Sequence, residues 1–496
     1  MLIDYELPPG VFRNGTRYSA QGRFYDADLW RWFEGTQLPV GGWRFKSAQL
    51  VTGKPRAILT WVDSENQTWA AVGSNTGLFV YTRGGSLSTI TPMGFIPGPA
   101  DATTGGGYGL GAYGAGYYGT PRPDDTNVIP ALVWTLDTWG SILIACDGRD
   151  IYEWDPAVGG LATLLSAGSV DPLDAAPSAV AIFVTEEGAI TALGAAGDPR
   201  KVEWADPEDR HMWRPSGTNL AGGFRIQSQG SLRCGKRIRG GATISTDTDK
   251  HLMSYSASSP DVYDIQRIGS GCGIISKQAA AVVDQREYSM GSNRFWVFNG
   301  ALDPLECDVG DFVFQNINPA QISKVSAVHN SQFGEVWWFY PSQGSLENDS
   351  YVVHNYREGH WNIGSLVRLC GTDKGVFQYP LLMGSDGRLY EHEVGQQRDG
   401  RSPYALSGPV EIGTGEKTVS VYGIIPDEQS LGEVQVSFTT GDWTMSPDFE
   451  EGPFSLSEKT DVRFNGRRVS IKMVATPDVD FRVGVFRFNI KQASGR

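Results

Sequence analysis

The chain has 496 residues, more than one compact core usually holds, and this length predicts two or three domains. It carries 42 lysine and arginine residues against 56 aspartate and glutamate residues. The resulting formal net charge of −14 argues against a protein whose main task is to neutralise nucleic-acid phosphates. The 62 glycines, the 15 tryptophans and the scarcity of helical periodicity predict a mostly β protein.

Residues 1–50 are dense in arginine, glycine and aromatic residues, and we expect them to form an extended N-terminal arm. Only DADLWRWFEG (26–35) has the character of a short helical turn, with Asp26 or Asp28 as its cap. Large aromatic residues in the arm should anchor it by burial, on its own core or on a neighbouring subunit. These residues are Trp30, Trp32, Phe33 and Trp43, and the three tryptophans are interface candidates.

The start of the sequence lacks the basic and apolar regions of a signal peptide, and no stretch approaches the roughly 18 apolar residues of a membrane span. We therefore expect a soluble protein with no membrane span and no export signal. The five cysteines are widely spaced and contain no C-x-x-C pair, so reduced thiols in a protein made in a cytosol are expected. They are Cys146, Cys234, Cys272, Cys307 and Cys370.

Residues 51–400 repeat one pattern, in which an apolar run, a polar turn and a short strand with an aromatic residue predict a β-hairpin. The clearest instances are AAVGSNTGLFVY (70–81), ILIACDGRDIYEW (142–154), GATISTDTDKHLMSY (241–255), YSMGSNRFWVF (288–298) and LLMGSDGRLYEHE (381–393). Such repetition predicts an irregular β-propeller of about six to eight blades, with a stack of two β-sandwiches as the alternative. The aromatic residues that mark the hairpins are unevenly spaced: Tyr81, Tyr152, Tyr255, Phe298, Tyr356 and Tyr390.

Two segments read as connections: LSAGSVDPLDAAPS (165–178) within the propeller region, and QQRDGRSPYALSG (396–408) at its end. Beyond the second connection, apolar and polar residues alternate with period 2. Residues 401–496 are therefore expected to form a C-terminal antiparallel, sandwich-like β domain, and packing against the N-terminal arm is one arrangement open to it.

The stretch GLGAYG (109–114), within the glycine and tyrosine-rich loop 105–119, fits the dinucleotide fingerprint G-x-G-x-x-G. The glycines continue to Gly119 and are followed by TPRPDD, so no helix can begin there to receive a pyrophosphate. We interpret the segment as an exposed contact loop. Its interface candidates are Tyr108, Tyr113, Tyr117 and Tyr118.

No other cluster predicts chemistry, and no catalytic residue, cofactor or metal site is expected. HNYREGH (354–360) places two histidines across a predicted turn rather than on a helix face, where a zinc site would need them. Cys272 lies between glycines in a tight turn without a partner base. The acidic run EWADPEDRHMW (203–213) would be the place for a pair of glycosidase carboxylates, and only fragments of sialidase-type boxes accompany it.

Three segments together resemble a family. GVFRNGTRYSAQGRFYDADLWRWFEGTQLPVGGWR (10–44), GDPRKVEWADPEDRHMWRPSGTNLAGGFRI (197–226) and EVWWFYPSQGSLENDSYVVHNYREGHWNIG (335–364) are similar to the tail nozzle, or packaged-DNA stabilisation, proteins of short-tailed bacteriophages. The resemblance covers most of the first 395 residues and less clearly the C-terminal part.

The resemblance implies a structural virion protein, not an enzyme: a homo-oligomeric ring, six-fold in the family, that retains packaged DNA and conducts it during ejection. The implied partners are portal and adaptor proteins above, tail needle, fibre or tailspike proteins, and double-stranded DNA that passes without sequence-specific binding. The implied location is the phage tail, after assembly in the host cytoplasm. Two alternatives remain open: a receptor-binding or glycan-cleaving tail protein that uses a propeller face, and a hub component of a long non-contractile tail.

Overall fold

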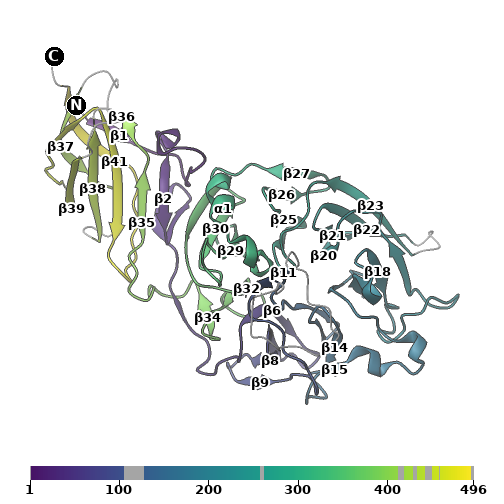
Figure 1. Ribbon diagram of the computed structural model, residues 1–496. Coiled ribbons are helices and arrows are strands. Elements are labelled where there is room, and N and C mark those ends of the chain that lie inside the picture. The colour runs from purple at the N-terminus through teal and green to yellow at the C-terminus, as the bar shows by residue number, and fades with distance from the viewer. Residues whose placement is uncertain are drawn as a thin grey trace, which may run out of the picture.

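The computed structural model describes residues 2–104, 128–256, 262–411, 418–427, 433–441, 449–456 and 459–492. Within these ranges, seven four-stranded antiparallel sheets surround a common centre, and two further sheets form a sandwich beside them (Figure 1). The predicted all-β fold class, a β-propeller with a C-terminal antiparallel β domain, is confirmed. The propeller has seven blades, and the alternative of two stacked sandwiches is wrong.

Each of the first four blades is a meander of consecutive strands, numbered from the innermost outward. The first is β6 (Pro55–Val62), β7 (Thr68–Ser74), β8 (Gly77–Thr82) and β9 (Leu87–Thr89). The second is β12 (Thr135–Trp139), β13 (Ile142–Cys146), β14 (Ile151–Trp154) and β15 (Thr163–Leu164). The third is β16 (Ala181–Val184), β17 (Ile190–Leu193), β18 (Lys201–Trp204) and β19 (Gly222–Arg225). The fourth is β20 (Leu232–Ile238), β21 (Gly241–Thr246), β22 (Asp249–Tyr255) and β23 (Tyr263–Ser270).

The seventh blade takes its outermost strand from the N-terminal arm, because β5 pairs with β34 there. The fifth blade is β24 (Ala280–Val283), β25 (Arg286–Met290), β26 (Phe295–Phe298) and β27 (Leu302–Leu305). The sixth is β28 (Ser326–Asn330), β29 (Glu335–Tyr340), β30 (Ser350–Asn355) and β31 (His360–Ser365). The seventh is β32 (Cys370–Thr372), β33 (Leu381–Met383), β34 (Leu389–His392) and β5 (Trp43–Phe45).

The innermost strands contact one another in chain order, β6, β12, β16, β20, β24, β28 and β32, and β32 returns to β6. The ring is thus closed, and each blade packs between two neighbours, an arrangement that leaves only short sheet edges. The connections between blades carry short helices. These are η2 (Leu165–Gly168), η3 (Pro172–Asp174), α1 (Gly310–Asn316) and η5 (Pro319–Lys324), while η4 (Ala195–Gly197) lies within the third blade, between β17 and β18.

The sandwich combines strands from both ends of the chain. One sheet has the order β1 (Leu2–Tyr5), β42 (Phe486–Gln492), β37 (Val419–Ile425) and β40 (Phe464–Gly466). The other has the order β2 (Phe24–Asp28), β35 (Tyr404–Ser407), β41 (Arg468–Ala475), β38 (Val434–Gly441) and β39 (Phe449–Ser455), with β36 (Val410–Glu411) also on β41. The N-terminal arm therefore supplies a strand to each sheet.

The arm contains no helical turn at residues 26–35, so that prediction is wrong. β2 ends at Asp28, Leu29 adopts φ 52°, and β3 (Trp30–Phe33) then forms a hairpin with β4 (Thr36–Pro39). The only helical turn of the arm is η1 (Arg17–Ala20), within the described residues. The strand agrees with the β-propensity of tryptophan and phenylalanine, and Trp30 and Trp32 are buried at the joint between the sandwich and the propeller.

One hydrophobic core cluster runs through the sandwich and into the propeller. It contains Phe438 and Phe488 of the sandwich together with Trp338 and Trp361 of the sixth blade, and Trp30 of the arm. Continuous burial of this kind stabilises a fixed arrangement of the two parts, because separating them would expose large apolar side chains to water.

Candidate functional site

The β3–β4 hairpin lies at the joint between the propeller and the sandwich. The Trp30 ring packs on Phe481, with centroids 4.5 Å apart, and its indole nitrogen donates to Gln37 Oε1 at 3.1 Å. Gln37 and Val483 exchange backbone hydrogen bonds, each of 2.9 Å. The hairpin is therefore tied to the C-terminal part of the chain.

The three tryptophans expected as interface residues are buried. Trp30, Trp32 and Trp43 have exposed fractions of 0%, 4% and 4%. Trp32 packs against Phe24 with ring centroids 4.8 Å apart, and Trp43 stacks on His392 at 5.5 Å. Of the two expected arrangements, the structure shows burial on the chain's own core.

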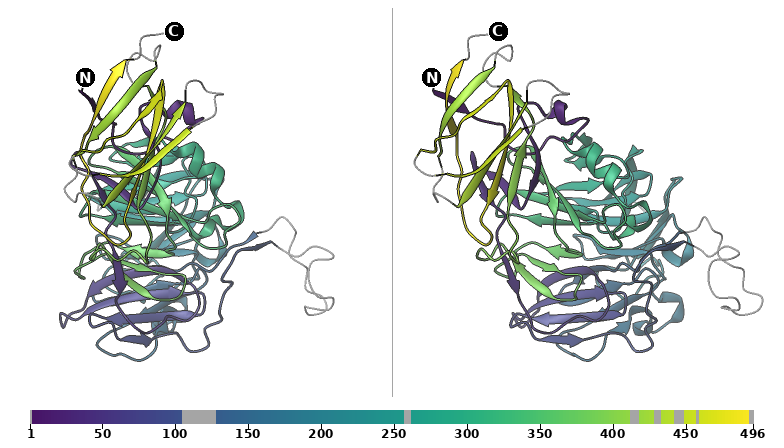
Figure 2. Two further views of the ribbon diagram at one scale, coloured as in Figure 1. Left: turned by 90° about the vertical axis from the view of Figure 1, so that its left-hand side faces the viewer. Right: turned by 60° about the vertical axis from the view of Figure 1, so that its left-hand side comes forward.

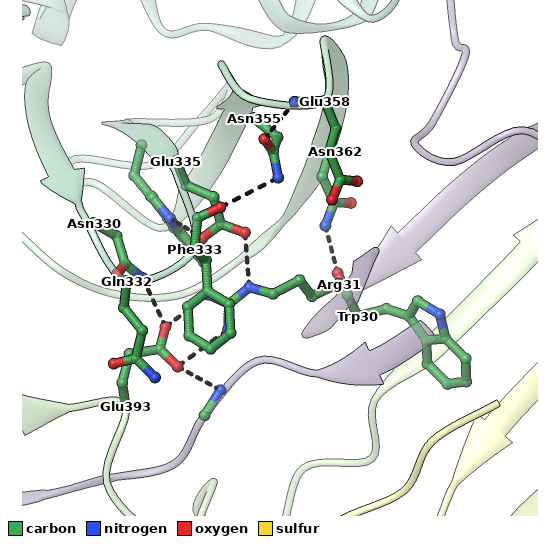
Figure 3. A network of polar contacts seen from close by, with 12 residues as sticks. Trp30, Arg31, Asn330, Gln332, Phe333, Glu335, Asn355, Glu358, Asn362 and Glu393 are labelled. Carbon is green, nitrogen blue, oxygen red and sulfur yellow. Dashed lines mark hydrogen bonds and ion pairs between the residues drawn. The ribbon is translucent and has the colours of Figure 1, made fainter. Parts of the chain in front are cut away.

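Arg31 is the centre of a buried ion-pair network at this joint (Figure 3). Its guanidinium donates to Glu335 from Nε at 2.7 Å and Nη2 at 2.8 Å, and to Glu393 from Nη2 at 2.6 Å and Nη1 at 3.1 Å. It also lies 3.7 Å from the centroid of the Phe333 ring. Burial alone would lower the pKa of Arg31, but the two carboxylates outweigh burial and hold that pKa above its usual value. The network joins β3 to the sixth blade through Glu335 and to the seventh through Glu393.

Glu393 is held in one position by several donors. Its Oε2 accepts from the Gly41 backbone N–H at 3.0 Å, and its Oε1 accepts from the Asn330 amide at 2.9 Å. Its backbone has φ 58°, a conformation that costs a non-glycine residue about 1–3 kcal/mol and persists only where the surroundings enforce it. A Cβ at Gly41 would overlap Glu393 Oε2, so only glycine fits at that position. These contacts together hold the Glu393 carboxylate in one position beside Arg31.

The sequence reasoning missed this network. Its only local signal is a single charge, Arg31, inside the apolar run WRWF of a predicted arm. A lone arginine rarely becomes fully buried without partners, so the pattern could have raised the question of where its counter-charges lie. The partners themselves are 304 and 362 residues away in the chain, beyond the reach of any spacing rule.

The glycine and tyrosine-rich loop and its candidates Tyr108, Tyr113, Tyr117 and Tyr118 lie outside the described residues. The flanking residues form a two-stranded ribbon of β10 (Thr103–Thr104) and β11 (Val128–Ile129). Figure 2 shows this ribbon leading away from the body of the propeller. The two residues of β11 are exposed although both are apolar, a combination that suits a contact surface.

Exposed large apolar side chains concentrate in one stretch of the chain, from the end of the first blade to the start of the third. They include the fully exposed Val170 and Leu173, which is 70% exposed. We call this set the apolar sector: Met93, Ile96, Val128, Ile129, Val158, Leu161, Leu164, Val170 and Leu173. Exposed apolar side chains that gather in one region are typical of partner surfaces, so we take the apolar sector as a candidate partner surface.

The other candidates of the sequence are not brought together. His354 and His360 lie on neighbouring strands across a turn, as predicted, and burial lowers the pKa of each to about 4. Cys272 is buried and its thiol pKa is raised by burial. Among the described residues, no group of three histidine, cysteine, aspartate or glutamate side chains is arranged to hold a metal ion.

The acidic run lies on the outer side of the third blade. Glu203 is on β18, where it forms an ion pair with Lys201, and Asp206 and Glu208 follow in the next loop. Glu153 of the second blade pairs with Arg210 at 2.5 Å and with His211 at 3.0 Å. These carboxylates take part in ion pairs and turns at the periphery of the propeller and do not face its centre.

No helix in the described part of the chain is long and apolar enough to cross a membrane. No family model matches the chain, and no curated protein matches its sequence.

Several solved structures are similar. Virginiamycin B lyase from Staphylococcus aureus has a TM-score of 0.40 and 8% identity, over 71% of this chain and 99% of the lyase. A gluconolactonase from Xanthomonas campestris has a TM-score of 0.32 and 10% identity, over 74% of this chain and 98% of that one. An exo-β-1,3-galactanase from Phanerochaete chrysosporium has a TM-score of 0.30 and 12% identity, over 91% and 100%. No activity is transferred from these proteins, because the identities are too low.

Proposed function

We propose that this chain is a structural subunit of a short-tailed phage tail, a nozzle ring that retains packaged DNA and conducts it during ejection. The observation that carries the proposal is the place of two of the three segments on which the family resemblance rests. Segments 10–44 and 335–364 meet at the joint, where Val11 N–H donates to Trp361 O at 2.7 Å and Arg31 pairs with Glu335. The resemblance thus falls on contacts that hold two parts of the molecule together, in keeping with a structural role rather than a catalytic one.

The apolar sector supports a partner role. A ring closes when one surface of each subunit meets a different surface of the next, and such an interface needs apolar area at its centre. The apolar sector, which includes β11 of the ribbon, would offer that area on the propeller. Adaptor, portal, needle, fibre or tailspike proteins would be the further contacts of the assembled ring.

The charge of the chain is compatible with a DNA channel. A formal net charge of −14 per subunit, repeated around a ring, would repel phosphates and let duplex DNA slide without adhesion.

Particle size of the purified full-length protein tests the proposal, by mass photometry and electron microscopy with and without adaptor-bearing particles. A closed ring is expected, in solution or on the particles. Changing Val170 and Leu173 together to Asp should abolish the ring, because two charges would be placed in its interface. Leu346→Asp is the matched control, since Leu346 is 56% exposed outside the apolar sector. A wild-type protein that stays monomeric and never joins the particles would contradict the proposal.

A receptor-binding or glycan-cleaving tail protein is the second candidate, and one observation favours it: charged cavities lie in the centre of the propeller. Release of sugars from host surface polysaccharide by the purified protein would establish the cleaving form. A copurifying tail-tube protein would instead point to a hub of a long tail.

A further inference from the structure

The centre of the propeller contains two cavities that share Lys277 in their walls. The inner cavity, of about 260 Å³, is lined by the innermost strands of the second to fifth blades and by Leu59 of the first. The outer cavity, of about 280 Å³, opens where those strands begin, next to Ile129 of the ribbon. Each has room for several water molecules, or for a phosphate or carboxylate group.

The charged lining is mainly positive. The inner cavity has Lys236, Arg237 and Lys277 against one carboxylate, that of Asp137. The outer cavity adds two arginines and one aspartate, which are Arg149, Arg233 and Asp147. Five cations therefore face two carboxylates, in a chain whose formal net charge is −14. Such a reversal of sign concentrates anions at this point of the molecule.

The two carboxylates are already engaged. Asp147 binds Arg149 in the outer cavity, with Nη2 to Oδ2 at 2.6 Å. Asp137 accepts from the Val184 backbone N–H at 2.8 Å, and burial raises its pKa despite this bond and the nearby positive charges. Arg149 thus balances Asp147, which leaves Asp137 as the one other carboxylate in the lining beside Lys236, Arg237 and Lys277.

Lys277 lacks an acidic partner among the described residues. Its Nζ donates to Val180 O at 2.6 Å and lies 3.5 Å from Val133 O, so at least one of its three protons has no strong acceptor. A Cβ at Gly148 would lie 2.8 Å from this nitrogen, so the ammonium group rests directly on the glycine backbone. Burial lowers the pKa of Lys277, and a bound anion would offset that cost.

Unlike Lys277, the side chains of Lys236 and Arg237 make no hydrogen bond or ion pair with the described residues, although both line the inner cavity. Phe183 packs directly over Gly235, where a Cβ would overlap the ring. The glycine thus keeps the wall next to Lys236 free of a further side chain. One part of the wall of the outer cavity is apolar, with Leu132, Val133 and Ile275.

We propose that the propeller channel is a binding site for a small anion that carries phosphate or carboxylate groups, held by Lys236, Arg237 and Lys277, with Arg233 at the entrance. The apolar outer wall would contact the uncharged part of the ligand. Two kinds of ligand carry such an anionic group, a phosphate ester and an acidic sugar. The two probes used below distinguish them.

Isothermal titration calorimetry of the full-length protein at constant ionic strength tests the site, with sodium pyrophosphate and sodium glucuronate as probes. We expect saturable binding of at least one probe at one site per chain. The probe that binds more tightly identifies the source. The proposal would be overturned if neither probe bound saturably at concentrations up to about 10 mM. Dissociation constants above that value are weaker than those of weak specific ligands.

Changing Lys236 and Arg237 together to Gln should weaken binding by about tenfold or more, because charge-assisted hydrogen bonds are lost. Arg225→Gln is the matched control, since Arg225 is an exposed arginine on β19 outside both cavities and should leave the affinity unchanged within about twofold. Lys277→Met is the second variant, with the melting temperature measured in parallel. Unchanged affinity in the Lys236/Arg237 variant would overturn the assignment, whatever the behaviour of Lys277→Met.

Discussion

Arg31 and Glu393 are 362 residues apart in the chain, and Arg31 Nη2 lies 2.6 Å from Glu393 Oε1. The two side chains join the start of the chain to the end of the seventh blade. Arg31 also binds Glu335 of the sixth blade. One guanidinium therefore holds the β3–β4 hairpin, which contacts the sandwich, against two blades.

Replacing Arg31 by Met should destabilise the protein strongly. The variant leaves two carboxylates in a buried site without their counter-charge, and breaking a buried pair in this way costs about 3–5 kcal/mol. Urea unfolding followed by tryptophan fluorescence measures the loss. Arg44→Gln is the control, since Arg44 is exposed and its pair with Glu391 should contribute about 0–1 kcal/mol. Equal effects of the two variants would show that the network does not hold the joint.

Trp43 should be required for closure of the propeller. It lies on β5, the strand that the arm adds to the seventh blade, and only 4% of its surface is exposed. Trp43→Ala should cost about 3–5 kcal/mol, since it removes a large buried aromatic ring. Phe45→Ala on the same strand is the matched control, because Phe45 is 53% exposed. Limited proteolysis should cleave the Trp43 variant faster in the seventh blade, and a pattern like that of the wild type would contradict the closing role.

The five thiols should react slowly in the native protein. All five cysteines are free, and burial raises the thiol pKa to about 11 for Cys146 and Cys234 and to about 12 for Cys370. At pH 8 almost no thiolate is therefore present to attack a disulfide reagent. Labelling with an aromatic disulfide reagent should proceed at the rate of unfolding, with all five thiols accessible in 6 M guanidinium chloride. Two or more thiols reacting within about a minute in native buffer would contradict this.

The hairpins of the propeller could be predicted from the sequence because each is a local pattern. Five of the six aromatic residues that marked them lie on the third strand of a blade, and Tyr356 directly follows such a strand. The exception is the third blade, whose third strand, β18, ends in Trp204. That residue was read as part of an acidic run, because the carboxylates around it concealed the alternation of Val202 and Trp204 toward the core.

The joint could not be predicted, because it depends on contacts between distant parts of the chain. Trp30 and Trp32 gave the correct expectation of burial, but their surroundings come from Phe481 and from the sixth blade. The positive charge of the channel was also hidden. Arg233 and Lys236 of β20 look like ordinary surface cations until ring closure brings Lys277, about 40 residues further on, to the same centre.

His354 and His360 should make the protein less stable in weak acid. Burial lowers the pKa of both imidazoles to about 4, whereas in the unfolded chain each would titrate near 6.5. Between pH 6.5 and about 4 the unfolded state binds more protons than the folded state, so the free energy of unfolding must fall as the pH falls through this range. The full loss would be about 3 kcal/mol for each histidine.

The His354→Phe variant isolates this effect. The His354 ring packs 4.6 Å from Trp361 and 6.0 Å from Tyr288, so an aromatic replacement keeps the packing while removing the titrating group. Urea unfolding at pH 7 and pH 5 should show a smaller difference between the two pH values in this variant than in the wild type. His360→Gln should reduce the difference as well, and the two changes together should reduce it further. An unchanged pH dependence in both variants would mean that other groups control acid stability, because each imidazole would then bind protons equally in the folded and unfolded chain.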